Sequence, residues 1–579
     1  MTETADLVIR NGTVVDGSGR KPFRADVAIT GDVITHVGHR EITAVEEIDA
    51  DGHFVTPGFV DIHTHYDGQA IWEETLSPSS NHGVTTVVIG NCGVGFAPCR
   101  NADRENLIRL MEGVEDIPGV VMTEGLTWEW ETFPEYLAAL ERRRHDVNIA
   151  FFLPHSPLRV YVMGERAAAG ETATDGDLKV MSGIVEEAMR EGALGVGSSR
   201  TIFHRSSSGE LIPTFDADMA ELDAIAGAIA RSGGGVLQVA SDFKEFSQVK
   251  HEFDLLKEVA RKHNLTLTIP VAENHTLPEV HREIMRHINE ANDAGVHVKA
   301  QVMPRGVGLL FGLELSAHPF ALSPSYKAIE HLPIDERVAV MKDPAFKRKL
   351  LEEPVPDTKT ALHKFIRGFG GMFEIGEGFN YEPDFSESIQ ARASSRGESP
   401  LSLAYDILVE KKSSAALYMP FVNYAHGNLD SVGELIANRD VVMGLGDGGA
   451  HYGIICDASY STFLLSYWSR DRVRGQKIAL EKAVSMLSRE TAAMVGLEDR
   501  GLIAPGYRAD LNVIDFDGLR LRNPQIVFDL PSGGRRLIQK SEGYRATIVN
   551  GKVIYREGVA TGARTGELVR GRRKGPVLR

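Results

Sequence analysis

Cysteine is scarce in this chain: three residues among 579, namely Cys92, Cys99 and Cys456. Three scattered thiols do not form a disulfide framework, so a reducing, cytoplasmic location is predicted. The first seven residues include Glu3 and Asp6 and no basic segment ahead of an apolar stretch, a pattern that is not typical of a signal peptide. No stretch approaches ~20 uninterrupted apolar residues, so we expect no membrane-spanning segment.

Positive charge is also in deficit. The 63 Lys and Arg residues face 80 Asp and Glu residues, which gives a formal net charge of −17. This balance argues against a nucleic acid or an anionic membrane as partner, since either needs a broad basic surface. The basic residues near the C-terminus are interpreted as a solvated tail: Arg570, Arg572, Arg573, Lys574 and Arg579. A hydrophobic share of 42% with 25% charged residues is typical of a folded globular protein.

Short alternating strands are predicted at both ends of the chain. Residues 6–16 read as two strands around Asn11-Gly12, and residues 26–37 continue in the same style. Residues 509–515 and 545–555 repeat the pattern near the other end. Because such strands cannot bury a core alone, we expect the two ends to pair in one small β-sandwich domain. The long middle then interrupts that domain.

The middle alternates apolar runs with helical patterns, as parallel β/α units do. Helices are expected over 177–191, 217–232 and 253–263. The eight predicted strands span residues 55–65, 85–93, 148–155, 193–199, 234–241, 265–273, 296–303 and 441–447. The pattern predicts the α/β class and a (β/α)8 TIM-type barrel. The alternative, an open doubly wound sheet, lacks its glycine-rich dinucleotide turn after the first strand.

One connection is unusually long, from residue 305 to residue 440. Loops of this length are usually functional, and helices are expected around 345–353, 360–371 and 401–411. We interpret the segment as a cap over the barrel mouth. The predicted division is residues 1–56 and 500–579 for the β-sandwich with its basic tail, and 57–499 for the barrel with its 305–440 insertion.

The first predicted barrel strand ends in two histidines, His63 and His65. Residues two apart on a strand face the same side, and strand ends at the carboxyl face are where such barrels place their sites. Two neutral imidazoles at this spacing can chelate a divalent metal, and Asp61 and Asp67 bracket them. The pattern therefore predicts a metal site.

Several motifs carry a family resemblance. They are Pro-Gly-Phe-Val-Asp-x-His-x-His-x-Asp at 57–67, Ile-Gly-Asn-Cys-Gly-Val-Gly-Phe-Ala-Pro at 89–98, Leu158-Arg159, the strand at 193–199, Asp-Leu-Pro-Ser-Gly-Gly-Arg-Arg at 529–536 and Ile-Val-Asn-Gly at 548–551. From about residue 5 to about residue 570 the chain resembles the amidohydrolase superfamily, in its D-aminoacylase (N-acyl-D-amino-acid deacylase) branch. The resemblance implies a metal-dependent barrel beside a small β-sandwich, which hydrolyses the amide of N-acylated D-amino acids.

Further site residues follow from that resemblance. Cys92 could be a small buried hydrophobe, but the resemblance implies that it is a metal ligand. Asp447 stands where the superfamily has its strand-eight aspartate, which binds the metal and serves as catalytic acid and base. His451 is a candidate for binding substrate or metal, with a loop role as the alternative.

The sequence departs from the superfamily pattern at strands five and six, where histidines are typical. Here Gln238 and Asp242 stand at the fifth strand, and Glu273 and His275 stand at the sixth. Gln238 is a poor ligand for a transition metal, whereas the two carboxylates could bind through oxygen. The expected cofactor is therefore one Zn2+ ion held by His63, His65, Cys92 and Asp447, without a clear second ion.

Two more residues are predicted to bind substrate. Arg159 could pair with a substrate carboxylate, and His155 could polarise a carbonyl or contact substrate. The predicted activity is metal-dependent hydrolysis of an N-acylated, D-configured amino acid, a small-molecule amide. Three alternatives stay open: a cyclic amide, another amide, and a degenerate barrel that serves as a binding or assembly protein. A homo-oligomer is also left open by the sequence.

Overall fold

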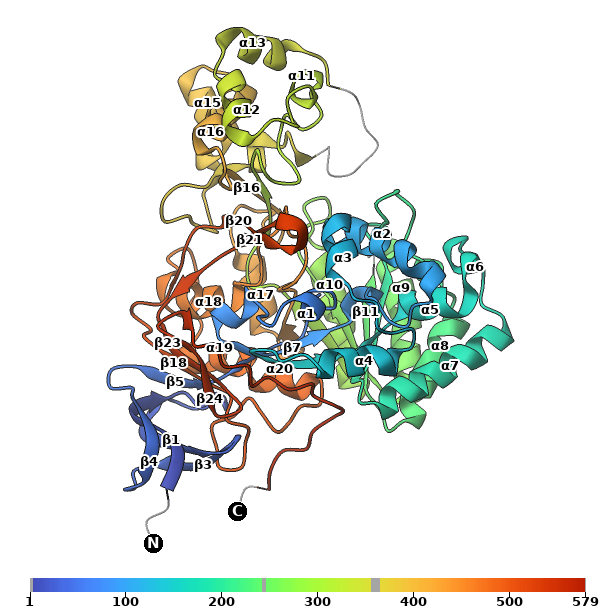
Figure 1. The fold of residues 1–579 in the computed structure, drawn as a ribbon, viewed down its shortest axis with the longest axis vertical. Coiled ribbons are helices and arrows are strands. Elements are labelled where there is room, and N and C mark those ends of the chain that lie inside the picture. The colour runs from blue at the N-terminus through green and yellow to red at the C-terminus, as the bar shows by residue number, and fades with distance from the viewer. Residues whose placement is uncertain (1–3, 242–245, 356–364, 578–579) are drawn as a thin grey trace.

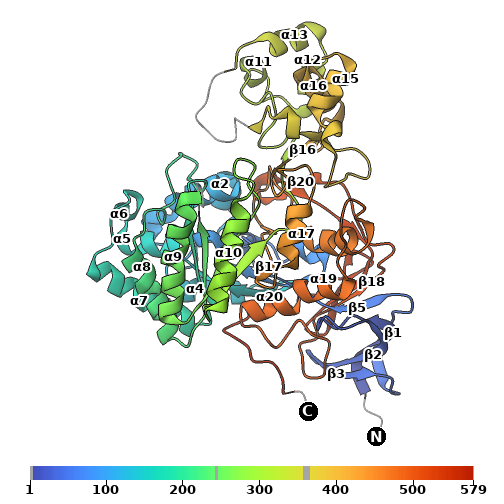
Figure 2. The same cartoon turned by 180° about the vertical axis from the view of Figure 1, so that it is seen from behind.

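The computed structural model describes residues 4–241, 246–355 and 365–577. Figure 1 shows three regions: strands from both chain ends at the bottom, a central α/β body, and a helical insertion at the top. The reverse view in Figure 2 keeps this order, with both termini at the same end of the molecule as the terminal strands. No helix among the described residues has the length and apolar character needed to cross a membrane.

Strands from the two chain ends share one nine-stranded sheet, as the sequence predicted. Its order is β25-β24-β23-β18-β5-β1-β2-β3, with β4 paired to β1. The two ends meet where β5 and β18 pair antiparallel, with Val55 opposite Val513. The strands are β1 (Thr4–Val14), β2 (Phe23–Thr30), β3 (Val33–Gly38), β4 (Thr43–Asp49), β5 (Phe54–Pro57), β18 (Leu511–Ile514), β23 (Tyr544–Val549), β24 (Lys552–Arg556) and β25 (Val559–Ala560).

The two Asn-Gly pairs of this sheet have different structures. Asn550-Gly551 forms the predicted turn between β23 and β24. Asn11-Gly12 does not form the predicted turn, because β1 runs straight through it with a bulge between Ile9 and Gly12. A Cβ at Gly12 would come within 2.4 Å of Val55 Cγ2, so the glycine is needed for the close approach of β5. The predicted turn at Asn11-Gly12 was therefore wrong, because packing against a strand distant in the sequence decides the structure there.

The central body contains the eight predicted parallel strands in sequence order. One sheet has the order β6-β7-β8 and another β9-β10-β11-β12-β13-β17. The third predicted strand, 148–155, is divided into β8 and β9 by a single residue, Phe152, so the eight predicted strands have nine labels. The strands are β6 (Phe59–Asp61), β7 (Val84–Ile89), β8 (Asn148–Phe151), β9 (Leu153–Pro154), β10 (Gly195–Arg200), β11 (Val236–Ser241), β12 (Thr266–Pro270), β13 (Val298–Val302) and β17 (Val441–Met443).

The first and last of these strands are joined just beyond their ends. Thr64 and Gly448 form a parallel bridge, and His65 N–H donates to Gly448 O at 2.8 Å. The predicted strand 55–65 is corrected here, because its first part, β5, belongs to the terminal sheet, and only β6 belongs to the parallel strands. The two histidines therefore follow a strand rather than lie on it.

The expected helices cover the parallel strands (Figure 2). Those predicted over 177–191, 217–232 and 253–263 are α7, α8 and α9. α7 begins with a capping box in which Thr174 and Asp177 bond each other's backbone N–H groups. The helices that matter most here are α2 (Arg104–Glu115), α5 (His155–Met163), α7 (Asp175–Arg190), α8 (Met219–Arg231), α9 (Phe246–His263), α10 (Val280–Asp293) and α17 (Asp430–Ala437).

The insertion has its own apolar core and stands away from the central body (Figure 1). A three-stranded sheet of order β14-β16-β15 leads into and out of it. The helices expected around 345–353 and 401–411 are α13 (Pro344–Glu352) and α16 (Pro400–Lys411), whereas part of the third expected helix, 360–364, lies outside the described residues. The strands are β14 (Val307–Phe311), β15 (Phe373–Glu374) and β16 (Leu417–Val422). Among the described residues of the insertion, only Phe421 and Val422 at its base line the pocket described below, so its role as a cap stays a prediction.

The basic C-terminal segment is packed against the central body rather than solvated throughout. Val569 N–H donates to Ile149 O at 2.7 Å, and Gly571 N–H donates to Gly192 O at 2.7 Å. Arg570 pairs with Glu191 and Glu141. The backbone groups of this segment are satisfied by strand ends and loops, which corrects the interpretation of a free tail.

Candidate metal centre and active-site pocket

The structure brings His63, His65 and Cys92 together behind the ends of β6 and β7. Both imidazoles are 1% exposed, and their ring centroids are 5.4 Å apart. His63 Nε2 lies 3.2 Å from Cys92 Sγ, and donor atoms of all three residues lie within 4.8 Å of one another. Two imidazole nitrogens and a sulfur form a donor set that suits zinc.

The orientation of His63 is fixed by the strand on the far side of the site. Its Nδ1 lies 2.6 Å from Oε1 of Gln301 on β13. Because an amide oxygen only accepts, Nδ1 carries the proton and Nε2 keeps its lone pair for the cluster. Burial lowers the pKa of His63 to about 4, although the Gln301 contact partly opposes this. Burial also lowers the pKa of His65, so both rings are in the neutral, metal-binding form.

Cys92 occupies a tight turn directly after β7. Its φ of 54° is left-handed, and its N–H donates to Gln238 Oε1 at 2.8 Å. The following Gly93 has no room for a side chain, because a Cβ there would lie 2.9 Å from Ser198 Cα. Burial raises the pKa of the thiol, and the neighbouring carboxyl groups of Glu115 and Asp447 raise it further. Gln238 thus supports the Cys92 turn.

Asp447 approaches the two imidazoles from the loop after β17. Its Oδ1 lies 3.5 Å from His63 Nε2 and 3.7 Å from His65 Nε2. Its backbone N–H donates to His63 O at 3.2 Å, which ties the loop to the first histidine. Burial raises the pKa of this carboxyl group, and the charge of His451 opposes the rise.

Two further histidines border the cluster. His451 Nε2 lies 3.8 Å from Asp447 Oδ2, so the structure brings this predicted residue to the site. His204, in the loop after β10, lies at the same cavity, and its Nδ1 is 2.9 Å from Ser199 Oγ. Burial lowers the pKa of His204 to about 3 and that of His451 below its usual value.

Glu115 is a site residue that the sequence reasoning missed. It ends helix α2, is 1% exposed, and its Oε1 lies 3.4 Å from His65 Nδ1. Its Oε2 lies 3.6 Å from His451 Nε2. A signal was present, because Glu115 stands four residues after Met111 on the apolar stripe of an amphipathic helix. A carboxylate on the buried face of a helix needs a buried partner.

These residues line a cavity of about 490 Å³. The lining includes the histidines, Cys92, Glu115 and Asp447, and the rest of the lining, called the apolar side here, is largely apolar. The apolar side includes Val271, Val280, Ile284, Phe421, Val422 and Leu445. Phe203, which is 66% exposed, also lines the cavity. β11 contributes Ala240 and Ser241, and β12 contributes Pro270, so the strand-five and strand-six ends present small or apolar groups to the cavity.

His155 and Arg159, both predicted to bind substrate, lie elsewhere. His155 Nδ1 is 2.8 Å from Ser198 Oγ, and its Nε2 is 2.8 Å from Glu221 Oε1. Arg159 donates to Glu221 Oε2 at 3.4 Å and to Pro213 O at 3.1 Å. All four side chains have an exposure of 0%. The geometry corrects their assignment, because each faces a protein partner and neither lines the cavity.

The candidates at the sixth and fifth strands are also accounted for. Glu273 is buried and accepts hydrogen bonds from Ala425 N–H and Ser431 Oγ, both at 2.7 Å. These contacts hold the segment before α17, so the carboxylate does not face the metal cluster. His275 does not line the cavity, and Asp242 lies outside the described residues.

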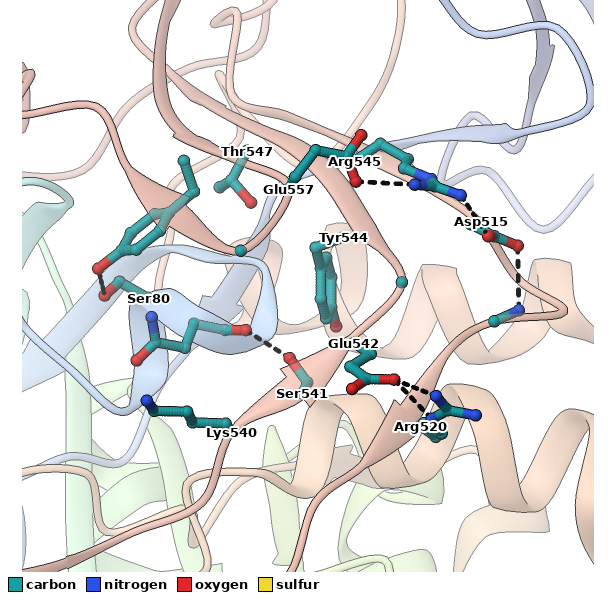
Figure 3. Close-up of a pocket in the computed structure, with 15 residues that line it drawn as sticks. Ser80, Asp515, Arg520, Lys540, Ser541, Glu542, Tyr544, Arg545, Thr547 and Glu557 are labelled. Atoms are coloured by element: carbon teal, nitrogen blue, oxygen red, sulfur yellow. Dashed lines mark hydrogen bonds and ion pairs between the residues drawn. The ribbon is translucent and has the colours of Figure 1, made fainter.

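A second cavity, of about 410 Å³, lies beside the terminal sheet (Figure 3). Most of its charged groups pair among themselves, since Arg545 contacts Asp515 and Glu557, and Arg520 contacts Glu542. Neither histidine nor cysteine is among the described residues that line it. The chemistry therefore favours the first cavity as the functional one.

The residues of the first cavity fit a divalent metal ion. Asp447 Oδ1 is one of the buried polar atoms without a hydrogen-bond partner, and it lies 3.5 Å from His63 Nε2 and 3.7 Å from His65 Nε2. Such atoms are costly unless a ligand or an ion satisfies them. Nitrogen, sulfur and carboxylate oxygen donors around one point are the combination that zinc accepts. His63, His65, Cys92 and Asp447 are the side chains placed to hold it.

Comparison with known proteins places the chain in a family. The model of the amidohydrolase family matches residues 46–555. The D-aminoacylase of Alcaligenes xylosoxydans xylosoxydans is 26% identical over 97% of this chain and 97% of its own length. A crystal structure of D-aminoacylase has a TM-score of 0.64 at 23% identity, over 98% of this chain and 100% of the other.

A further solved structure carries ligands in its description. The N-acyl-D-glutamate deacylase of Bordetella bronchiseptica, complexed with zinc and a phosphonate inhibitor, has a TM-score of 0.63 at 21% identity, with 98% of this chain and 100% of that chain covered. These similarities confirm the resemblance carried by the motifs at residues 57–67 and 89–98. The chain belongs to the amidohydrolase family.

Proposed function

We propose that this amidohydrolase cleaves the amide bond of an N-acylated amino acid, most readily of the D configuration, with one zinc ion held by His63, His65, Cys92 and Asp447. The observation that carries the proposal is the convergence of two imidazoles and a thiol beside a partnerless carboxylate oxygen, all facing one cavity. The relatives named D-aminoacylase and N-acyl-D-glutamate deacylase support the substrate class.

When bound, such an ion supplies a Lewis acid and makes a water molecule more acidic. Asp447 is positioned to take the proton of the attacking water and to return it to the departing nitrogen. Its carboxyl group is partly buried, and this burial raises its pKa above the ordinary value. His451, 3.8 Å from Asp447, is proposed to contact the substrate at the same end of the cavity.

The architecture that we propose is a (β/α)8 barrel with its site at the carboxyl ends of the strands. The sequential parallel order and the bridge between Thr64 and Gly448 support closure between the first and eighth strands. The solved D-aminoacylase supports the same fold. The domain division at residues 56 and 500 and the capping role of residues 305–440 belong to this proposal.

The lining of the cavity guides the choice of substrate. Its apolar side favours an apolar acyl group or amino-acid side chain, because each buried methylene contributes about 0.8 kcal/mol. The described lining residues include neither arginine nor lysine. That observation favours a second candidate, an uncharged amide such as a cyclic amide, which would not need a partner for a carboxylate.

Metal content and hydrolysis of an amide panel test the proposal. The panel contains N-acetyl-D-methionine, N-acetyl-L-methionine and a cyclic amide, dihydrouracil. We expect one zinc ion per wild-type chain and a preference for the D substrate. Cys92→Ser should lose the ion and the activity together, since it removes a donor of the cluster.

Cys99→Ser is the matched control, because Cys99 is also buried but does not line the cavity. Turnover of dihydrouracil alone would favour the second candidate. A chain that purifies without metal and stays inert after zinc is added would contradict both and would favour a binding or assembly protein.

A further inference from the structure

We infer that Glu115 is a positioning residue of the metal centre, which holds His65 and His451 on opposite sides of its carboxylate. The inference rests on the proposed zinc site and adds a residue outside the strand ends. Glu115 comes from helix α2, whereas His65 follows β6 and His451 follows β17. One side chain thus contacts both the segment that follows β6 and the segment that follows β17.

The carboxylate of Glu115 lacks the partner that a buried acid normally has. It is 1% exposed, and within the described parts of the chain its only ion-pair contacts are to imidazoles, His65 at 3.4 Å and His451 at 3.6 Å. A buried carboxylate without a cation is costly. A cation held by the neighbouring His65, Cys92 and Asp447 would supply the missing positive charge.

His65 presents its two nitrogens to different groups. Its Nδ1 faces Glu115, while its Nε2 lies 3.7 Å from Asp447 Oδ1 on the side of the metal cluster. Histidine ligands usually donate their second N–H to a carboxylate or carbonyl, which fixes the tautomer and the ring orientation. His63 is arranged in the same way, with Gln301 at Nδ1 and Cys92 at Nε2. Glu115 therefore has the place at His65 Nδ1 that Gln301 has at His63 Nδ1, as an ion-pair contact at 3.4 Å in place of a hydrogen bond at 2.6 Å.

The backbone around Glu115 docks the strand-eight loop without help from the side chain. Glu115 O accepts a hydrogen bond from His451 N–H, and Asp116 Oδ2 accepts one from Gly453 N–H at 3.0 Å. Asp116 has a φ of 50° and turns the chain out of the helix at this point. Replacing only the Glu115 carboxylate should therefore leave the loop in place, which makes the inference testable.

The test measures cobalt and zinc affinity of purified Glu115→Gln and Glu115→Ala by competition with a chelator, together with the visible spectrum of the cobalt-loaded proteins. We expect the metal Kd to rise by about 10–100-fold in both variants, the usual effect of losing a group that orients a ligand. The bands of cobalt bound to Cys92 should shift as His65 changes orientation. Thermal unfolding of the metal-free variants should stay cooperative.

Asp116→Asn is the matched control, since Asp116 holds the same loop but contacts neither imidazole. It should leave the metal Kd and the cobalt spectrum unchanged, even if it lowers the unfolding temperature. A wild-type Kd and spectrum in Glu115→Gln would overturn the inference. A wild type that binds metal but hydrolyses none of the amides would contradict the proposed substrate alone. The role of Glu115 would still be tested by comparing the metal Kd of the wild type with that of the Glu115 variants. A wild type that binds neither ion would overturn both.

Discussion

Two buried clusters of this protein combine imidazoles with a carboxylate at the carboxyl ends of parallel strands. In the first, His63 and His65 meet Cys92, Asp447 and Glu115 beside the cavity. In the second, His155 lies between Ser198 and Glu221, and Arg159 completes the group. The residue types are similar, and the sequence reasoning assigned histidines of both clusters to function.

The clusters differ in whether their polar atoms are satisfied. In the second, both nitrogens of His155 and both oxygens of Glu221 have protein partners, and no side chain is exposed. In the first, Asp447 Oδ1 has no hydrogen-bond partner, and the group faces a cavity of about 490 Å³. A closed network fixes structure, whereas an incomplete one leaves room for an ion and a substrate.

The comparison is tested most severely at Asp447. Asp447→Asn removes the proposed proton carrier but keeps the size of the side chain, so kcat should fall by about 10²–10⁴-fold. The free energy of unfolding of the metal-free protein should not fall, because burial raises the pKa of this carboxyl group and so disfavours its charged form. Steady-state kinetics on the best amide and urea unfolding measure the two quantities.

Asp146→Asn is the matched control for this variant. Asp146 is 1% exposed but stands just before the amino end of β8, where it accepts from Leu76 N–H at 2.9 Å. Its replacement should change the free energy of unfolding and leave kcat unchanged. An Asp447→Asn protein with wild-type kcat would remove Asp447 from the mechanism.

In the closed network of His155, Arg159 and Glu221 we expect the opposite result, a loss of stability with kcat unchanged. Glu221→Gln leaves Arg159 and His155 buried without their carboxylate, and breaking a buried pair of this kind costs about 3–5 kcal/mol of unfolding free energy. Metal content and kcat per folded molecule should stay at wild-type values, since Glu221 does not line the cavity. Urea unfolding and elemental analysis test this. A large loss of kcat at unchanged stability would return His155 and Arg159 to the active site.

Local signals in the sequence predicted the candidate ligands His63 and His65, which need only a two-residue spacing. Cys92 was assigned as a candidate ligand through the family resemblance of the motif at residues 89–98. The order of the parallel strands also followed from apolar runs and helical spacing, because sequential β/α units are local structures. Asp447 was found through the family resemblance of the last strand.

The rest depends on contacts between distant segments. Glu115 meets His65 and His451 only when helix α2 packs over the strand ends. No residue near Glu115 in the chain indicates that these two histidines are its partners. Arg159 was predicted to bind a substrate, but the structure pairs it with Glu221, 62 residues away. Asn11-Gly12 has the sequence of a turn, yet packing against Val55 makes it a bulge.

The smallest expected effect is a pH dependence of stability in the closed network. Burial alone would raise the pKa of Glu221, but the hydrogen bond with His155 and the charge of Arg159 lower it below the usual 4.5. A carboxyl group with a lowered pKa stabilises the fold above its unfolded pKa, and this contribution is lost as the pH falls through the folded value. The difference in unfolding free energy between wild type and Glu221→Gln should therefore be largest near neutral pH and narrow in acid below about pH 4.5. Urea unfolding from pH 7 downwards measures it, and a difference that stays constant with pH would show that the carboxylate carries no such linkage.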